Sequence, residues 1–175
     1  MSEFQRTYED TLGMIGRGAD QNGVRQFISF RVGTEDYAID ILAVREIKGW
    51  TRTTVLPNQP DYVRGVLNLR GAIVPVFDLR SRFGQGPTEA TAKHVVVIVA
   101  VGDRLVGLLV DQVSDILSVA DDNIGAVPET SIRGDHRYLA GIITQGDTMV
   151  VLLALDTLFD TLTLPGDQPA HETAA

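Results

Sequence analysis

The residues best placed to do chemistry in this 175-residue chain lie in the short stretch 68–80, NLRGAIVPVFDLR. It opens with a polar turn that contains Arg70, carries Pro75 inside an apolar run and ends near Asp78. An exposed charge such as Arg70 can orient a binding partner. An apolar run with a proline at its centre is a poor buried strand, so we interpret this stretch as one that serves binding as well as packing.

The rest of the sequence holds no pattern typical of catalysis or metal binding. The three histidines are isolated, without metal-ligand spacing, and read as surface or strand-end residues: His94, His136 and His171. There is no cysteine, no Gly-x-Ser-x-Gly motif, and the run at 121–123 lacks the alternating acids and glycine of a calcium loop. No pair of carboxylates stands in an apolar setting that would tune a general acid. We therefore expect no enzymatic activity and no cofactor.

Composition restricts the partners. The formal net charge is -8, and the 15 basic residues are scattered along the chain. Nucleic-acid binding needs clustered Lys and Arg, so it is not expected. Apolar runs such as Val95–Val101 are far too short to cross a bilayer, and the N-terminus does not resemble a secretory signal. We expect a cytoplasmic protein with no direct membrane insertion.

Strand signals dominate the body of the chain, residues 25–162. Residues 26–32 alternate apolar and polar side chains, and Val95–Val101 is typical of a strand buried on both faces. Turn residues separate these runs, which predicts an all-β fold. Residues 1–24 read as a flexible arm and residues 163–175 as a disordered tail.

The body also repeats itself. A shift of 69 positions lays Val32-Gly33 on Val101-Gly102, and a shift of 76 lays Tyr62 on Tyr138. Each copy contains a predicted hairpin, at 65–77 and 141–153, with glycine in its turn. A short helical turn follows each hairpin, with Leu and Phe four positions apart at 79 and 83 and at 155 and 159. We predict two small barrels side by side, formed by internal duplication.

The duplication separates packing from function. Residues kept in both copies are explained by packing, whereas four in the first copy have unlike counterparts: Asn68 falls on Thr144, Arg70 on Gly146, Pro75 on Val151 and Asp78 on Ala154. Because the second copy folds without them, we infer that the first copy does not need them for its fold. Pro75 further predicts an edge or bulged strand that invites a partner. The alternative for Arg70 is a solvated turn arginine.

Three segments carry a resemblance to a known family. Residues 37–50, 60–83 and 106–117 resemble the CheW family of bacterial chemotaxis coupling proteins. The resemblance covers residues 25–162. It implies two five-stranded SH3-like barrels with a groove between them and a non-catalytic adaptor. The implied partners are the regulatory domain of the histidine kinase CheA and the cytoplasmic tips of methyl-accepting chemotaxis receptors, in membrane-associated arrays.

The resemblance also implies roles for particular residues. Receptor-facing positions match Val44, Glu46, Arg70, Val95 and Ile116, with Glu46 and Arg70 as a charge pair. Family glycines match Gly65, Gly107 and Gly141, which we interpret as backbone bends. For the kinase we predict the second hairpin, between Tyr138 and Met149. A small-barrel module for nucleic acid or oligosaccharide is the alternative function, and the acidic charge counts against it.

Overall fold

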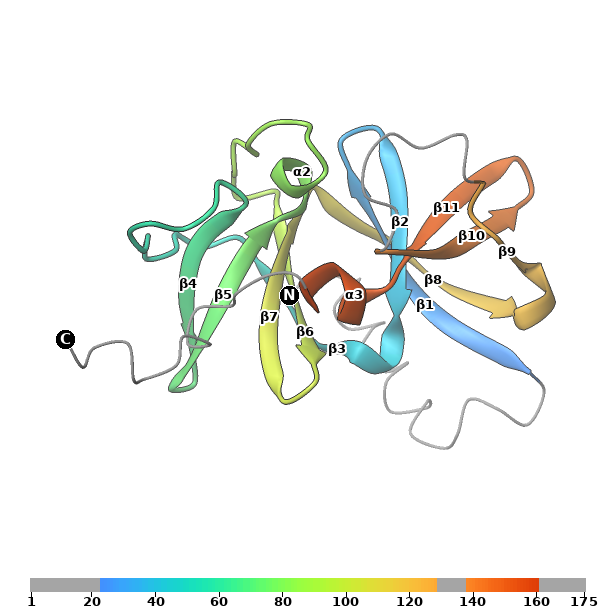
Figure 1. The fold of residues 1–175 in the computed structure, drawn as a ribbon, viewed down its shortest axis with the longest axis horizontal. Helices are drawn as coiled ribbons and strands as arrows, with labels where there is room; N and C mark the ends of the chain where they lie inside the picture. The colour runs from blue at the N-terminus through green and yellow to red at the C-terminus, as the bar shows by residue number, and fades with distance from the viewer. Residues whose placement is uncertain (1–22, 129–137, 161–175) are drawn as a thin grey trace.

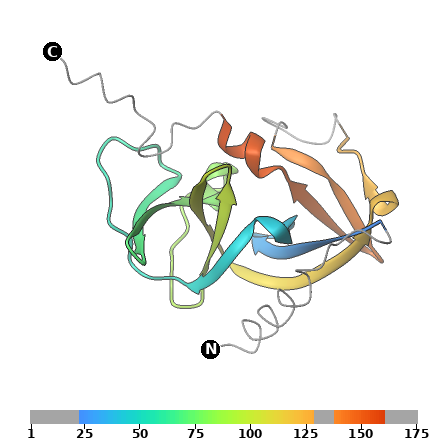
Figure 2. The same cartoon turned by 90° about the horizontal axis from the view of Figure 1, so that it is seen from below.

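The computed structural model describes residues 23–128 and 138–160, and Figure 1 shows two β-sheets side by side. The predicted tail, most of the predicted arm, His136 and His171 lie outside these residues. The six-stranded sheet has the order β8-β1-β2-β11-β10-β9 and the five-stranded sheet the order β3-β6-β7-β5-β4. Short helical turns connect some strands, and α3 lies at the junction of the two sheets in both views (Figures 1 and 2). The predicted all-β architecture is confirmed.

The bounds of the elements follow the predicted turns closely. The six-stranded sheet consists of β1 (Val24–Val32), β2 (Glu35–Asp40), β8 (Gln112–Ala120), β9 (Ile124–Gly125), β10 (Leu139–Gln145) and β11 (Thr148–Leu153). The five-stranded sheet consists of β3 (Val44–Gly49), β4 (Val63–Leu69), β5 (Ala72–Asp78), β6 (Val95–Val101) and β7 (Arg104–Val110). The helical turns are η1 (Ile41–Ala43), α2 (Leu79–Arg82), η2 (Asp121–Asn123) and α3 (Leu155–Asp160).

The strand pairing confirms the internal repeat. The β4–β5 hairpin has a bulge between Val63 and Gly65, and the β10–β11 hairpin has one between Leu139 and Gly141, 76 positions further on. Parallel pairing repeats in the same way. β5 pairs with β7 at Val76↔Gly107, and β11 pairs with β2 at the corresponding Leu152↔Ala38.

The two copies exchange strands, which the sequence did not predict. β3 leaves the β1–β2 hairpin and pairs with β6 in the five-stranded sheet, while β8 crosses back and pairs with β1 in the six-stranded sheet. Each sheet therefore contains strands from both copies. Because neither copy completes a sheet alone, the two halves depend on each other for folding.

Three apolar clusters account for the core. The largest, the shared core, draws on both sheets and includes Phe30, Ile39, Phe77, Leu108 and Phe159. A smaller cluster lies within each sheet. β6 contributes to both kinds, because Val96 and Ile98 belong to the five-stranded sheet's own cluster and Val97 and Val99 to the shared core. The prediction that this strand is buried on both faces is confirmed.

The three glycines matched to the family have packing roles that differ. Gly65 stands at a bulge with φ 142°, and a Cβ there would collide with the carbonyl oxygen of Thr54. Gly141 also stands at a bulge, where a Cβ would lie 2.9 Å from the carbonyl oxygen of Gly125. Gly107 lies in regular strand, and a Cβ would approach Val96 Cγ1 to 2.9 Å. Close packing, rather than a bend, explains this third glycine.

Candidate partner-binding surface

The turn between β4 and β5 presents Arg70 to solvent, as predicted. Arg70 and Gly71 have φ angles of 51° and 89°. Positive φ at both central residues is what a type I′ hairpin turn requires. The Gly71 N–H donates to Asn68 Oδ1 at 2.9 Å, which closes the turn. The Arg70 side chain is 80% exposed at the tip.

Arg70 reaches back to the opposite edge of the same sheet. Its Nη2 lies 3.4 Å from Glu46 Oε2 on β3. Because β3 and β4 are the two edge strands of the five-stranded sheet, the ion pair links the hairpin turn to the far edge. An exposed pair of this kind contributes about 0–1 kcal/mol to folding stability. The Glu46–Arg70 pair is therefore better suited to recognising a charged partner than to stabilising the fold.

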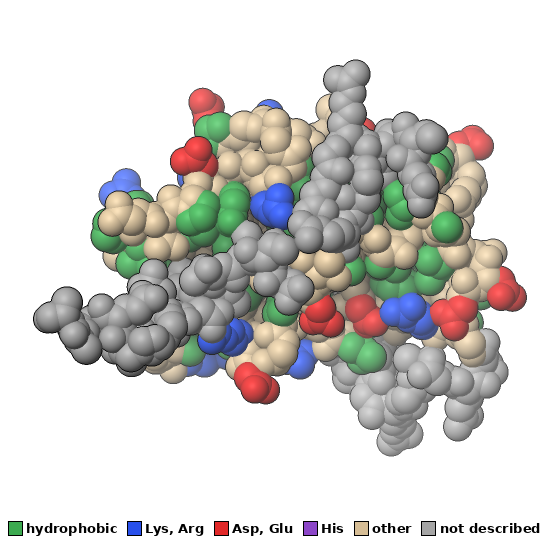
Figure 3. Space-filling view, in the orientation of Figure 1, with side chains coloured by type: hydrophobic (Ala, Val, Ile, Leu, Met, Phe, Trp, Pro, Cys, Tyr) green, Lys and Arg blue, Asp and Glu red, His purple; other side chains and the backbone are tan. Residues whose placement is uncertain are grey.

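Exposed apolar side chains accompany each hairpin. Ile73 on β5 pairs in register with Asn68 and is 64% exposed. Met149 occupies the equivalent place in the second hairpin and is 61% exposed. Figure 3 shows hydrophobic side chains gathered over the end of the molecule formed by β4 and the segment before it. Patches of this kind mark places where partners dock.

Three other predicted receptor-facing residues lie differently. Val44 is 3% exposed and belongs to the shared core, so it has no surface to offer a partner. The prediction that Val44 contacts a receptor is corrected, because Val44 is the first residue of β3 and its side chain points into the core. Val95 and Ile116 are half-buried against the same core, on β6 and β8 of different sheets. Of the five residues, the structure joins only Glu46 and Arg70 through a direct contact between charged groups.

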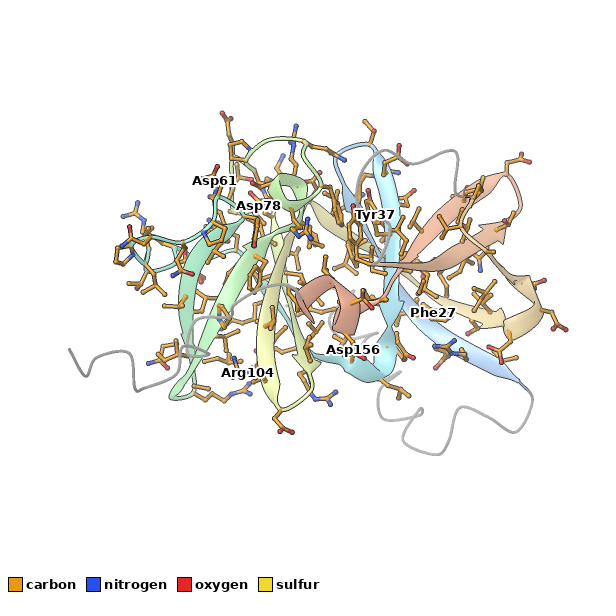
Figure 4. The ribbon with its side chains drawn as sticks, viewed as in Figure 1. Phe27, Tyr37, Asp61, Asp78, Arg104 and Asp156 are labelled. Atoms are coloured by element: carbon orange, nitrogen blue, oxygen red, sulfur yellow. The ribbon has the colours of Figure 1, made fainter. Side chains whose placement is uncertain are left out.

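A hollow of about 330 Å³ lies at the junction of the sheets, beneath α3. Alanines form much of its lining, from Ala43, Ala100, Ala140 and Ala154. Its charged groups are the Arg25–Asp40 ion pair, 3.2 Å long, and Asp156 of α3, which is labelled in Figure 4. None of the predicted receptor-facing residues lines this hollow. No sequence signal could have found it, because its lining comes from strands that only the exchange brings together.

Asp78 overturns the inference that the first copy folds without its unmatched polar residues. Its side chain is fully buried and caps α2, accepting from the backbone N–H groups of Arg80 and Ser81. It also accepts from the N–H and hydroxyl of Thr88, at 2.7 and 2.6 Å. These bonds hold the segment between α2 and β6, which connects the first copy to the second. Ala154 therefore does not show that Asp78 is dispensable.

Pro75 does not mark an edge strand. β5 lies inside the five-stranded sheet, between β7 and β4. Pro75 pairs with Val66 of β4, and the pairing with β7 begins only at Val76. The proline is tolerated because it precedes the doubly paired part of the strand. Its side chain is buried, so it offers no surface.

The two residues predicted to face the kinase also separate. Tyr138 is half-buried, its ring centroid lies 5.5 Å from that of Phe83, and the Arg82 guanidinium lies over it at 5.4 Å. Arg82 lies in the same way over Tyr62, the counterpart of Tyr138 in the first copy, at 5.6 Å. Packing explains Tyr138, which leaves Met149 as the accessible one of the two predicted residues.

The remaining polar groups are structural. His94 Nδ1 accepts from the Thr91 N–H, and its Nε2 lies 3.5 Å from Asp111 Oδ1. Burial raises the pKa of Tyr37 to about 12, with a further contribution from the charge of Glu35. Among residues 23–128 and 138–160, no group of three or more His, Asp or Glu side chains is arranged to hold a metal. The helices of the same residues are all too short or too polar to cross a membrane.

Comparison with known proteins identifies the family. Residues 26–163 match the CheW-like domain. The chain is 44% identical over 137 residues to the probable chemotaxis protein CheW of Rhizobium etli, covering 78% of this chain and 88% of the relative. It is 37% identical over 150 residues to the chemotaxis protein CheW of Klebsiella aerogenes, covering 86% and 90%.

The fold agrees with these sequences. The crystal structure of the scaffolding protein TtCheW from Thermoanaerobacter tengcongensis superimposes with a TM-score of 0.72 at 30% identity, covering 79% of this chain and 94% of that one. The family match over residues 26–163, the sequence relatives and the similar fold point the same way. The chain belongs to the CheW-like family.

Proposed function

We propose that this protein is a non-catalytic adaptor that couples the cytoplasmic tips of chemoreceptors to the histidine kinase CheA. The observation that carries the proposal is the Glu46–Arg70 pair at an exposed hairpin turn. Gly146 occupies the place of Arg70 in the second hairpin. The first turn thus carries a positive charge at the place where the second has glycine, and the second turn carries the acidic Asp147 instead.

Two unlike hairpins suit two unlike partners. The first combines the ion pair with exposed Ile73, and we assign it to the receptor tip. The second combines exposed Met149 with a turn formed by Gly146 and Asp147, and we assign it to the kinase. Charges at the rim of an interface set orientation and specificity more than affinity, which matches the exposure of Arg70.

The proposed site of action follows from the partners. Receptor tips would recruit the adaptor from the cytoplasm to membrane-associated arrays, without membrane insertion of its own. Val44, Val95 and Ile116 would act by shaping the core beneath this surface, since Val44 is buried and the other two are half-buried.

Co-sedimentation with receptor-containing membranes, with and without the kinase, tests both assignments. Arg70→Glu should lose receptor binding and keep kinase binding, and Glu46→Arg combined with Arg70→Glu should regain part of the loss. Met149→Ser should do the opposite, weakening only the kinase interaction.

Ile73→Ser is the matched control, because Ile73 occupies the same place in the first hairpin. It should affect the receptor and spare the kinase. Equal effects of Ile73→Ser and Met149→Ser on both partners would contradict the assignment of one hairpin to each.

A further inference from the structure

We propose that Asn68 is a positioning residue for Arg70, and this inference rests on the proposed receptor contact of Arg70. The observation is a short series of contacts around the turn between β4 and β5. Asn68 Oδ1 accepts from the Gly71 N–H at 2.9 Å, across a turn whose other central residue is Arg70. The side chain of Arg70 then extends to Glu46, 3.4 Å away on the far edge strand.

Arg70 needs such support because its backbone is unfavourable for a residue with a Cβ. Its φ of 51° lies in the left-handed region, where residues other than glycine and asparagine are rare. The equivalent residue of the second hairpin, Gly146, adopts nearly the same φ of 58° without that cost. The first hairpin keeps a strained backbone at Arg70, whereas the second avoids the strain with a glycine. Such strain points to a function for the Arg70 side chain.

The carboxamide of Asn68 is suited to holding this conformation. Asn side chains commonly accept from backbone N–H groups a few residues ahead and so substitute for a backbone turn. The second hairpin has Thr144 in this place, next to a glycine that needs no support. Asparagine and arginine thus occur together in one hairpin, and threonine and glycine in the other.

Among the described residues, three with charged or polar side chains meet at this turn, from two strands. Asn68 is the exposed residue near the end of β4, Glu46 stands on β3, and Arg70 extends from the turn to Glu46. Without the Asn68 bond, the turn would relax toward other conformations and the guanidinium would no longer be held over Glu46. A receptor would then meet a mobile charge instead of an oriented one.

The first test needs no partner. In hydrogen exchange of the full chain, Asn68→Ala should speed exchange of the Gly71 amide about five- to tenfold, the effect of losing one hydrogen bond of about 1 kcal/mol. Asn68→Asp keeps the acceptor and should stay within about twofold of wild type. Thr144→Ala, at the matched place in the second hairpin, should leave Gly71 unchanged. An unchanged Gly71 rate in Asn68→Ala overturns the proposal.

The second test uses binding to receptor-containing membranes. Asn68→Ala should weaken binding in the wild-type background and add nothing in an Arg70→Ala background, whereas Asn68→Asp should restore binding. Losses that simply add would mean that Asn68 acts by a contact of its own, which overturns the positioning role and leaves the adaptor function standing. If wild type itself fails to bind receptors, the proposed function fails, and the positioning role fails with it.

Discussion

Replacement of Asp78 tests how much of the fold depends on one buried carboxylate. The side chain is fully buried and accepts from Arg80 N at 3.1 Å, Ser81 N at 3.4 Å, Thr88 N at 2.7 Å and Thr88 Oγ1 at 2.6 Å. The guanidinium of Arg64 lies 4.0 Å away. Asp78→Ala removes every acceptor at once.

The expected cost can be worked from these contacts. Loss of a helix N-cap costs about 1 kcal/mol, and each buried donor left without an acceptor costs about 1–3 kcal/mol. Thr88 is buried and would lose both of its bonds to Asp78. We expect Asp78→Ala to lower the free energy of unfolding by about 3–7 kcal/mol, which is a large share of the 5–15 kcal/mol typical of a domain.

Urea unfolding at neutral pH measures this loss. Thr88→Val is the matched control, because it removes the 2.6 Å hydroxyl bond and keeps the N–H bond, and it should cost about 1–2 kcal/mol. Asp78→Asn should fall between the two, since an amide can satisfy only part of the donor set. A loss below about 1 kcal/mol for Asp78→Ala would refute the reasoning, because the buried donors would then have other partners.

Three further predictions concern single residues. The raised pKa of Tyr37, about 12 against an ordinary 10.0, means that the unfolded chain loses this proton first as pH rises. The contribution of Tyr37 to the free energy of unfolding is therefore fully present below pH 10, and it falls by about 2–3 kcal/mol as pH rises from 10 to 12. Unfolding curves of wild type and Tyr37→Phe, measured across this pH range, test this. Gly65→Ala should cost about 2 kcal/mol or more in urea unfolding, because its Cβ meets the Thr54 carbonyl, and a loss under 0.5 kcal/mol would contradict that close approach. Arg70→Asn should leave unfolding within about 0.5 kcal/mol of wild type, since asparagine tolerates positive φ, yet weaken receptor co-sedimentation measurably.

Much of the fold could be predicted because similar residues recur at a fixed spacing in the two copies. The shift of 76 that pairs Gly65 with Gly141 also gives the bulges and the hairpin bounds. The exchange of the β1–β2 and β6–β7 hairpins between the two copies could not be predicted in this way. Spacing within each copy is the same whether a strand pairs with its own copy or with the other, so only long-range packing decides between them.

The candidate surface was predictable in part, for a related reason. Arg70 stands out because a charged residue replaces a turn glycine, and the turn itself exposes it. Val44 was expected at the surface from the family resemblance alone, although valine is among the residues most often fully buried. Asp78 misled the comparison of copies, since its partner Thr88 lies in the segment that connects one copy to the other. A missing counterpart indicates function only where the surroundings are duplicated as well.

Reconstitution of receptor-controlled kinase activity is the most direct test of the adaptor function. Receptor-containing membranes and CheA would be combined with wild type, Arg70→Glu, Met149→Ser or no adaptor, and kinase autophosphorylation followed with and without receptor ligand. We predict that ligand-dependent control appears only with wild type, and that each variant loses it by failing to bind a different partner. Equal ligand control without the protein, or with Arg70→Glu, would contradict the account.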